Sequence, residues 1–150
     1  MNLSTVRYVG TGVLCIALGG LLLAVPGCGG RSVTEVKAQG EAGENLNVIA
    51  KAYVAATEKN NRPPASVEEL KPFLPPGVDQ DSLFRSPRDG EPFVIIWGAD
   101  PRTGMDLKPL VIGYEKQGSG GDRFVFTAMG VMQMAGDDFA QAKFPPGHQP

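Results

Sequence analysis

The sequence has few of the residues from which metal sites and catalytic centres are built. It holds one histidine, His148, and two cysteines, Cys15 and Cys28, in 150 residues. The spacing of these residues excludes the common zinc and haem sites. A catalytic histidine needs a fixed partner in a pocket, and a tail segment rarely provides either. We therefore expect no catalytic role for His148 and no cofactor.

The sequence also lacks an excess of basic charge. It carries 14 Lys and Arg against 16 Asp and Glu, a net charge of −2. Nucleic-acid-binding domains usually show a basic stripe or patch, so this class of partner is not expected. Glycine (20) and proline (13) predict many turns, while 42% hydrophobic residues argue against wholesale disorder.

One long apolar run is present, at residues 9–25, after a short polar start that carries Arg7. This order is typical of a secretory signal peptide. The run is 17 residues long, the lower limit for a membrane span, and Gly19 and Gly20 weaken it as a permanent helix. We therefore expect residues 1–27 to be a signal peptide and the remainder to be exported.

The residues that end this run, Val25-Pro26-Gly27-Cys28, resemble the lipobox of bacterial lipoproteins. Val25, Gly27 and Cys28 match that motif, and Pro26 departs from it. The resemblance implies cleavage between Gly27 and Cys28 and acylation of the Cys28 thiol, for instance by palmitate. Two acyl chains give stable anchoring, so we expect a protein anchored in lipid at the cell membrane or outer membrane, facing the periplasm or exterior. An uncleaved anchor and ordinary cleavage remain as alternatives.

A helical pattern begins near residue 44. Apolar side chains recur there at the spacing of one helix face. They are Leu46, Ile49, Ala50, Tyr53, Val54 and Thr57. We predict a helix over residues 44–59, stopped by Pro63 because the residue before a proline is disfavoured in a helix. The polar, glycine-dotted residues 28–43 predict a flexible tether or a frayed helix start.

The second half of the domain changes to short helical and extended patterns. Ser66 and Glu69 predict a capping box for a short helix. Runs of β-branched and aromatic residues separated by turn residues then predict antiparallel strands. The predicted strands are residues 93–97, 110–116, 123–127 and 131–134. These elements predict an α+β fold, with residues 131–134 as a candidate exposed edge for pairing with a partner.

Three stretches of the domain resemble the globular heads of type II secretion pseudopilins and of pilin-like bacterial lipoproteins. They are L-x-x-I-A-x-A-Y from Leu46, N-x-x-P-P-A-S-x-x-E-L from Asn60, and S-P-R-D-G-x-P-F-V-I-x-W-G from Ser86. The resemblance implies a long helix packed on a small antiparallel sheet of three or four strands. The organisation expected is a lipoprotein signal peptide (1–27), a tether (28–43), a pilin-like domain (44–136) and a C-terminal tail (137–150).

The same resemblance bears on metal binding and assembly. Major pseudopilins bind calcium in a loop of the sheet, and Asp100 and Asp106 flank the matching loop, although calcium needs six to eight oxygen ligands. Asp in such loops ordinarily bonds the backbone, so these two are weak candidates only. Pseudopilins also keep an apolar stem with an acidic residue, whereas the run here is free of acids and precedes Cys28. This departure implies a pilin-like head on a lipid tether.

The function expected is that of a membrane-anchored lipoprotein with a non-catalytic pilin-like domain that binds an envelope or secretion-system protein. A first alternative is a pseudopilin-like component of a type II secretion or pilus-like system, held by an uncleaved helix. A second is an envelope hydrolase with a site near Ser82, Ser86 or Asp89, which needs a nucleophile and a base in one pocket. For residues 85–90 we expect a solvated charged turn, with a recognition patch for an acidic partner as the alternative.

Overall fold

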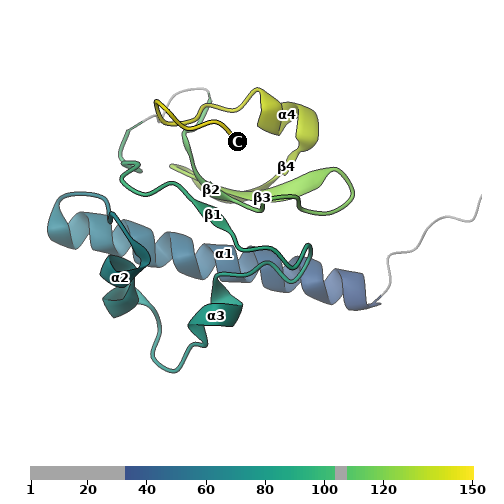
Figure 1. The fold of residues 1–150 in the computed structure, drawn as a ribbon, viewed down its shortest axis with the longest axis horizontal. Coiled ribbons are helices and arrows are strands. Elements are labelled where there is room, and N and C mark those ends of the chain that lie inside the picture. Colours follow the sequence, from purple (N-terminus) through teal and green to yellow (C-terminus); the bar gives the residue numbers. More distant parts are fainter. Residues whose placement is uncertain (1–32, 104–107) are drawn as a thin grey trace, which may run out of the picture. The chain divides into compact units, whose positions relative to one another are not determined.

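A long helix and a four-stranded antiparallel sheet form the framework of the chain (Figure 1). The structure is a computed structural model that describes residues 33–103 and 108–150. The predicted signal peptide, Cys28 and Asp106 lie outside the described residues. The α+β class and the antiparallel sheet are confirmed.

Helix α1 spans Val33–Asn60, so it begins well before residue 44. Of the two alternatives for residues 28–43, a flexible tether or a helix start, the helix start therefore applies from Val33 onward. Ala42 is fully buried, and a Cβ atom on Gly43 would lie 3.1 Å from the Phe124 ring. Contact with the sheet thus stabilises a segment of low helical propensity, because tertiary packing outweighs propensity. None of the helices in the described part of the chain is long and apolar enough to cross a membrane.

The sheet is a simple meander with strand order β1-β2-β3-β4. The strands are β1 (Val94–Ile95), β2 (Val111–Tyr114), β3 (Asp122–Thr127) and β4 (Gly130–Ala135). Strands β1 and β2 lie within their predicted ranges, and β3 and β4 extend beyond theirs by one residue, at one end of β3 and at both ends of β4. The two-residue connection between β3 and β4 closes because Gly130 has a φ of 114°, a region open to glycine.

Both faces of the sheet are covered. On one face α1 packs against it, with the Tyr53 and Phe126 ring centroids 5.8 Å apart. On the other face lies α4 (Gly136–Ala140). Its Phe139 side chain is buried, and the Phe139 and Tyr114 ring centroids lie 5.0 Å apart. Figure 1 shows the sheet between these two helices. Successive side chains along β3 and β4 point to opposite faces of the sheet, so one set packs toward α1 and the other toward α4.

The expectation of a separate tail at residues 137–150 is wrong. This segment folds over the sheet face opposite α1, and Phe144 lies 6.1 Å from Tyr114. The Lys143 carbonyl accepts the Val111 amide at 2.9 Å. The segment is stabilised on the sheet because its aromatic side chains bury an apolar sheet face that would otherwise be exposed to solvent.

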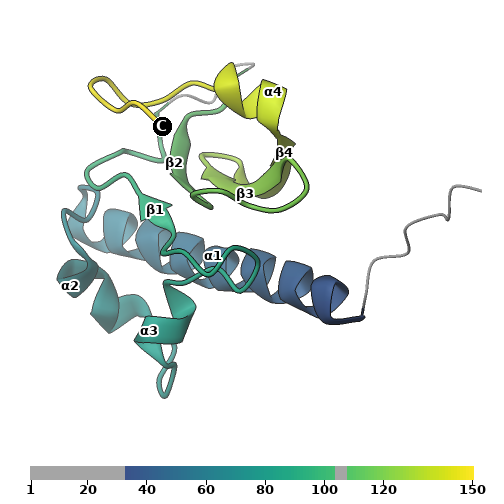
Figure 2. The same ribbon diagram turned by 45° about the vertical axis from the view of Figure 1, so that its right-hand side comes forward.

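Short helices lie on the side of α1 away from α4, as Figures 1 and 2 both show. They are α2 (Val67–Leu70), the 3-10 helix η1 (Lys71–Phe73) and α3 (Gln80–Leu83). Ser66 occupies the predicted N-cap position of α2, but its side chain does not make the predicted capping hydrogen bond. The Glu69 carboxylate instead accepts the Ala65 amide at 3.2 Å and pairs with Arg62 at 2.9 Å.

Candidate interaction site

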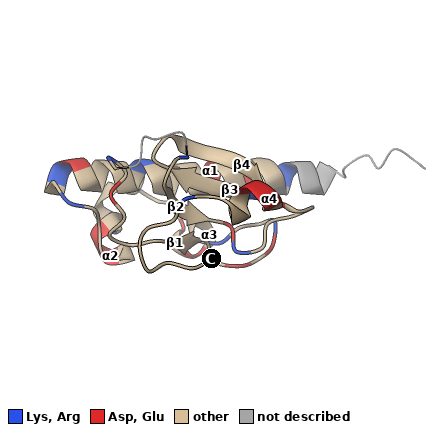
Figure 3. Cartoon of the chain, turned by 90° about the horizontal axis from the view of Figure 1, so that it is seen from above, with Lys and Arg blue, Asp and Glu red and all other residues tan. Residues whose placement is uncertain are grey.

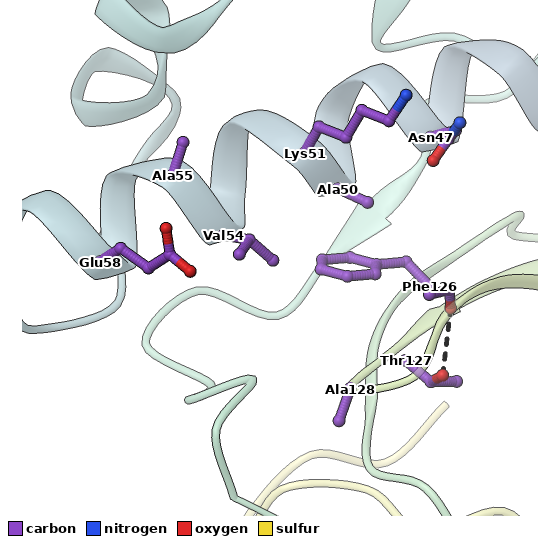
Figure 4. A pocket seen from close by; sticks show the side chains of 10 residues that line it. Asn47, Ala50, Lys51, Val54, Ala55, Glu58, Phe126, Thr127 and Ala128 are labelled. Atoms are coloured by element: carbon purple, nitrogen blue, oxygen red, sulfur yellow. Dashed lines mark hydrogen bonds between the residues drawn. The ribbon is translucent and has the colours of Figure 1, made fainter.

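An apolar hollow of about 290 Å³ lies between α1 and the β3–β4 hairpin (Figure 4). Its apolar lining includes Phe126, Ala50 and Val54, and Figure 4 shows the Phe126 ring pointing from the sheet toward the helix. Lys51 and Glu58 on α1 also line it and bring one charge of each sign. A hollow of this composition suits an apolar side chain from a partner.

Strand β4 forms one edge of the sheet, which confirms residues 131–134 as an edge strand. It pairs with β3 in unbroken register from Thr127–Gly130 to Asp122–Ala135. Among the described residues no strand pairs with its other side. The strand is six residues long and has no charged residue and no proline. Most natural edges are protected by one of these features or by a bulge, so β4 is open to pairing.

Met129 lies at the tip of the hairpin and is 69% exposed, a high value for a large apolar side chain. Its amide donates to the Thr127 hydroxyl at 3.1 Å, and that hydroxyl donates to the Gly130 carbonyl at 3.0 Å. These bonds fix the tip. Met129, the β4 edge and the hollow all belong to or border the β3–β4 hairpin, and together they are called the hairpin surface below.

The turn at residues 85–90 is exposed at Arg85, Pro87 and Gly90, as expected of a solvated turn, but Ser86 and the Arg88 side chain are buried. The Arg88 guanidinium donates to the Glu115 carboxylate at 2.9 Å, and the two side chains are 5% and 0% exposed. The fully buried Ser86 hydroxyl donates to the same carboxylate at 2.6 Å. Because Arg88 is buried and paired, it is not available to an acidic partner. Its hydrogen bonds to Glu115 and to the Ser119 carbonyl join this turn to the connection between β2 and β3.

The residues proposed for a hydrolase also hold turns. Ser82 donates to the Asp79 carboxylate at 2.5 Å. The Asp89 carboxylate accepts the amides of Gln117 and Gly118, at 3.0 and 2.8 Å. A hollow of about 420 Å³ beside α3 has none of Ser82, Ser86 and Asp89 in its lining. The three groups do not converge on one site.

Asp100, one of the two calcium candidates, is bound to protein groups. Its carboxylate accepts from the Arg102 guanidinium at 2.7 Å and from the Arg102 amide at 2.9 Å. These interactions lower the pKa of Asp100 below its ordinary value. Within residues 33–103 and 108–150, no three His, Cys, Asp or Glu side chains cluster closely enough to hold a metal ion.

His148 has a fixed neighbour, contrary to expectation. Its Nε2 lies 3.1 Å from the Tyr114 hydroxyl, and its ring lies 5.6 Å from the Phe144 ring. Burial raises the pKa of Tyr114, so the phenol stays protonated at neutral pH. The cluster completes the aromatic cover of the sheet. No regular spacing of Phe139, Phe144 and His148 marks this packing in the sequence.

Charge is spread over the domain rather than gathered at the hairpin surface. Figure 3 shows β4 without charged residues and acidic residues on the neighbouring α4. Of the hairpin surface, the sequence predicted only the edge strand. The hollow could not be predicted, because it forms between α1 and the β3–β4 hairpin, which are far apart in the chain. The chain matches no protein-family model, no curated protein and no solved structure.

Proposed function

We propose that this chain is an exported lipoprotein, anchored by acyl groups on Cys28, whose folded domain is a non-catalytic pilin-like interaction module of the cell envelope. The observation that carries the proposal is the apolar run at residues 9–25, free of charge, which ends in Val25 and is followed directly by Pro26-Gly27-Cys28. A cysteine at that place gives the sulfur to which acyl chains attach. Two such chains suffice for stable anchoring, whereas one binds marginally.

The fold supports the pilin-like part of the proposal. A long helix, α1, crosses one face of a four-stranded antiparallel meander, the arrangement that the three sequence stretches imply.

An interaction role is supported by what the domain offers to a partner. The hairpin surface combines an uncharged edge strand, the exposed Met129 and a hollow with an apolar floor. Sheet edges bind extended segments through backbone hydrogen bonds, and apolar pockets beside them supply specificity. Ser86 and Asp89, in contrast, use their polar atoms to hold the fold.

Labelling with radioactive palmitate tests the anchor. We expect label in the wild-type chain and in Cys15→Ala, and none in Cys28→Ala. Mass spectrometry of the mature protein should place its N-terminus at Cys28. A chain that starts at Met1, or label that persists in Cys28→Ala, would overturn the proposal and favour an uncleaved, pseudopilin-like anchor.

A further inference from the structure

We propose that the β4 edge pairs with the β4 edge of a second copy of this chain, antiparallel, with Gln133 opposite Gln133. The backbone groups available for this follow from the β3–β4 register. The hairpin closes at the Thr127–Gly130 pair, and Val125 pairs with Met132. In an antiparallel ladder, alternate residues point their N–H and C=O groups to opposite sides. Gly130, Met132 and Met134 therefore bond to β3, while Val131, Gln133 and Ala135 point outward.

Bonds elsewhere in the sheet agree with this assignment. The Glu115 amide donates to the Phe124 carbonyl at 3.0 Å, so Phe124 directs its backbone groups toward β2. Its neighbours Arg123 and Val125 must then direct theirs toward β4. The outward row of β4 thus has three donors and three acceptors on one straight strand.

A second β4 fits this row in one favoured register. When Gln133 lies opposite Gln133, Val131 lies opposite Ala135, and all three outward residues find bonding partners. Shifting the strands by two residues leaves one outward residue of each copy without a partner in the other β4. The favoured register has a two-fold axis through Gln133, and closed two-fold symmetry is the commonest form of assembly.

Charge also favours the antiparallel arrangement. Asp137 and Asp138 form the acidic first turn of α4, directly after β4. A parallel pair would place these acids against their own copies, a repulsive contact. The antiparallel pair instead separates the acids of the two copies and brings them to the hairpin end of the other copy, where residues 128–130 carry no charge.

The position of α1 suits two copies on one membrane, and in this point the inference rests on the proposed function. A two-fold axis perpendicular to the sheet keeps both α1 helices on the same face. Gln39, in the N-terminal part of α1, donates to Gln133 at 3.0 Å. The N-terminal parts of both helices therefore lie near the axis, so both chains can reach the same bilayer. Anchoring then raises the effective concentration at which the edges meet.

Cysteine cross-linking of the full chain in membranes tests the pairing and its register. Residues opposite each other in a hydrogen-bonded antiparallel pair have Cα atoms about 5.5 Å apart, within the range of a disulfide. We expect Gln133→Cys to give a disulfide-linked dimer on oxidation, roughly tenfold above the chain without the substitution. Ala135→Cys is the matched control, because its two copies would lie about 13 Å apart. Co-expressed Val131→Cys and Ala135→Cys should cross-link to each other.

Gln133→Pro tests the backbone bonds in the same assay. The Gln133 N–H points away from β3, so proline removes an outward donor and leaves the β3 ladder intact. We expect it to abolish the cross-link between Val131→Cys and Ala135→Cys. An undiminished cross-link would overturn the pairing.

Palmitate label followed on the same gel separates the two proposals. A labelled Gln133→Cys chain that stays monomeric overturns the pairing and leaves the anchor intact. A dimer without label overturns the anchor and supports the pairing. Equal cross-linking at positions 133 and 135, or cross-linking of Gln133→Cys only to a protein of different mass, overturns the pairing with a second copy.

Discussion

The Arg88 guanidinium and the Glu115 carboxylate lie 2.9 Å apart, and both side chains are buried. The carboxylate also accepts the Phe124 amide at 2.7 Å, and Arg88 donates to the Ser119 carbonyl at 3.0 Å. Burying charges is costly unless they are paired and their remaining hydrogen bonds are made. Here these conditions are met, so the pair joins the turn at residues 85–90 to the turn between β2 and β3.

We predict that Glu115→Ala or Arg88→Ala lowers the free energy of unfolding by about 3–5 kcal/mol, because each leaves the other charge buried and alone. Urea denaturation of the purified protein measures this. Lys116→Ala is the control, since Lys116 pairs with Glu91 at 3.4 Å on the exposed surface and should change stability far less. Single variants no less stable than the control would contradict the prediction.

A second prediction concerns Tyr53, whose hydroxyl donates to the Ala99 carbonyl at 2.9 Å and the Ile96 carbonyl at 3.2 Å. Tyr53→Phe should cost about 1–3 kcal/mol, because buried acceptors lose their donor. Tyr114→Phe should cost less, since its partner is the His148 ring at the surface. A Tyr53→Phe protein as stable as wild type in urea would show that the hydroxyl contributes no net stability.

The Tyr53 phenol also predicts how the free energy of unfolding changes at high pH. Burial raises the pKa of Tyr53 above its ordinary 10. Above pH 10 the unfolded chain releases this proton and the folded chain keeps it, so the wild type loses stability as pH rises. The loss should be smaller in Tyr53→Phe, measured as Tm from pH 9 to 11. A parallel decline in both proteins would assign it to other groups.

Local patterns predicted the elements of this fold better than its long-range contacts. The helix face from Leu46 and the four strands follow from spacing and turn residues, which act over a few positions. The Arg88–Glu115 pair joins residues 27 positions apart, so no local pattern marks it. The start of α1 was missed because Gly40 and Gly43 lower helix propensity, and only contact with Phe124 offsets this.

The candidate site shows the same division. Residues 131–134 could be named as a candidate edge because a small antiparallel sheet leaves its last strand unpaired on one side. The hollow needs Val54 and Phe126 to meet across two layers, which spacing cannot show. The packing of residues 137–150 was missed because their aromatic residues lack regular spacing and only Phe139 lies on a helix.

A third prediction concerns acid pH and the Asp100–Arg102 pair. The Arg102 guanidinium lowers the pKa of Asp100 below its ordinary 3.8. A carboxyl with a lowered pKa in the folded state contributes stability above its unfolded pKa, and this is lost as pH falls through the folded value. Asp100→Asn should therefore be less stable than wild type at pH 7, and the difference should shrink below pH 4. Urea denaturation at pH 7, 4 and 2 measures it; a constant difference would exclude titration of Asp100 as its source.

The fourth prediction tests the early start of α1. Gly40 lies inside the helix with open space where a Cβ would stand, whereas a Cβ on Gly43 would lie 3.1 Å from the Phe124 ring. Glycine inside a helix costs about 0.5–1 kcal/mol relative to alanine. Gly40→Ala should raise the free energy of unfolding by about that amount, while Gly43→Ala should gain less because the Phe124 ring must move. If residues 33–43 were a tether, neither substitution would change the urea midpoint, because residues that stay unfolded contribute nothing to the transition.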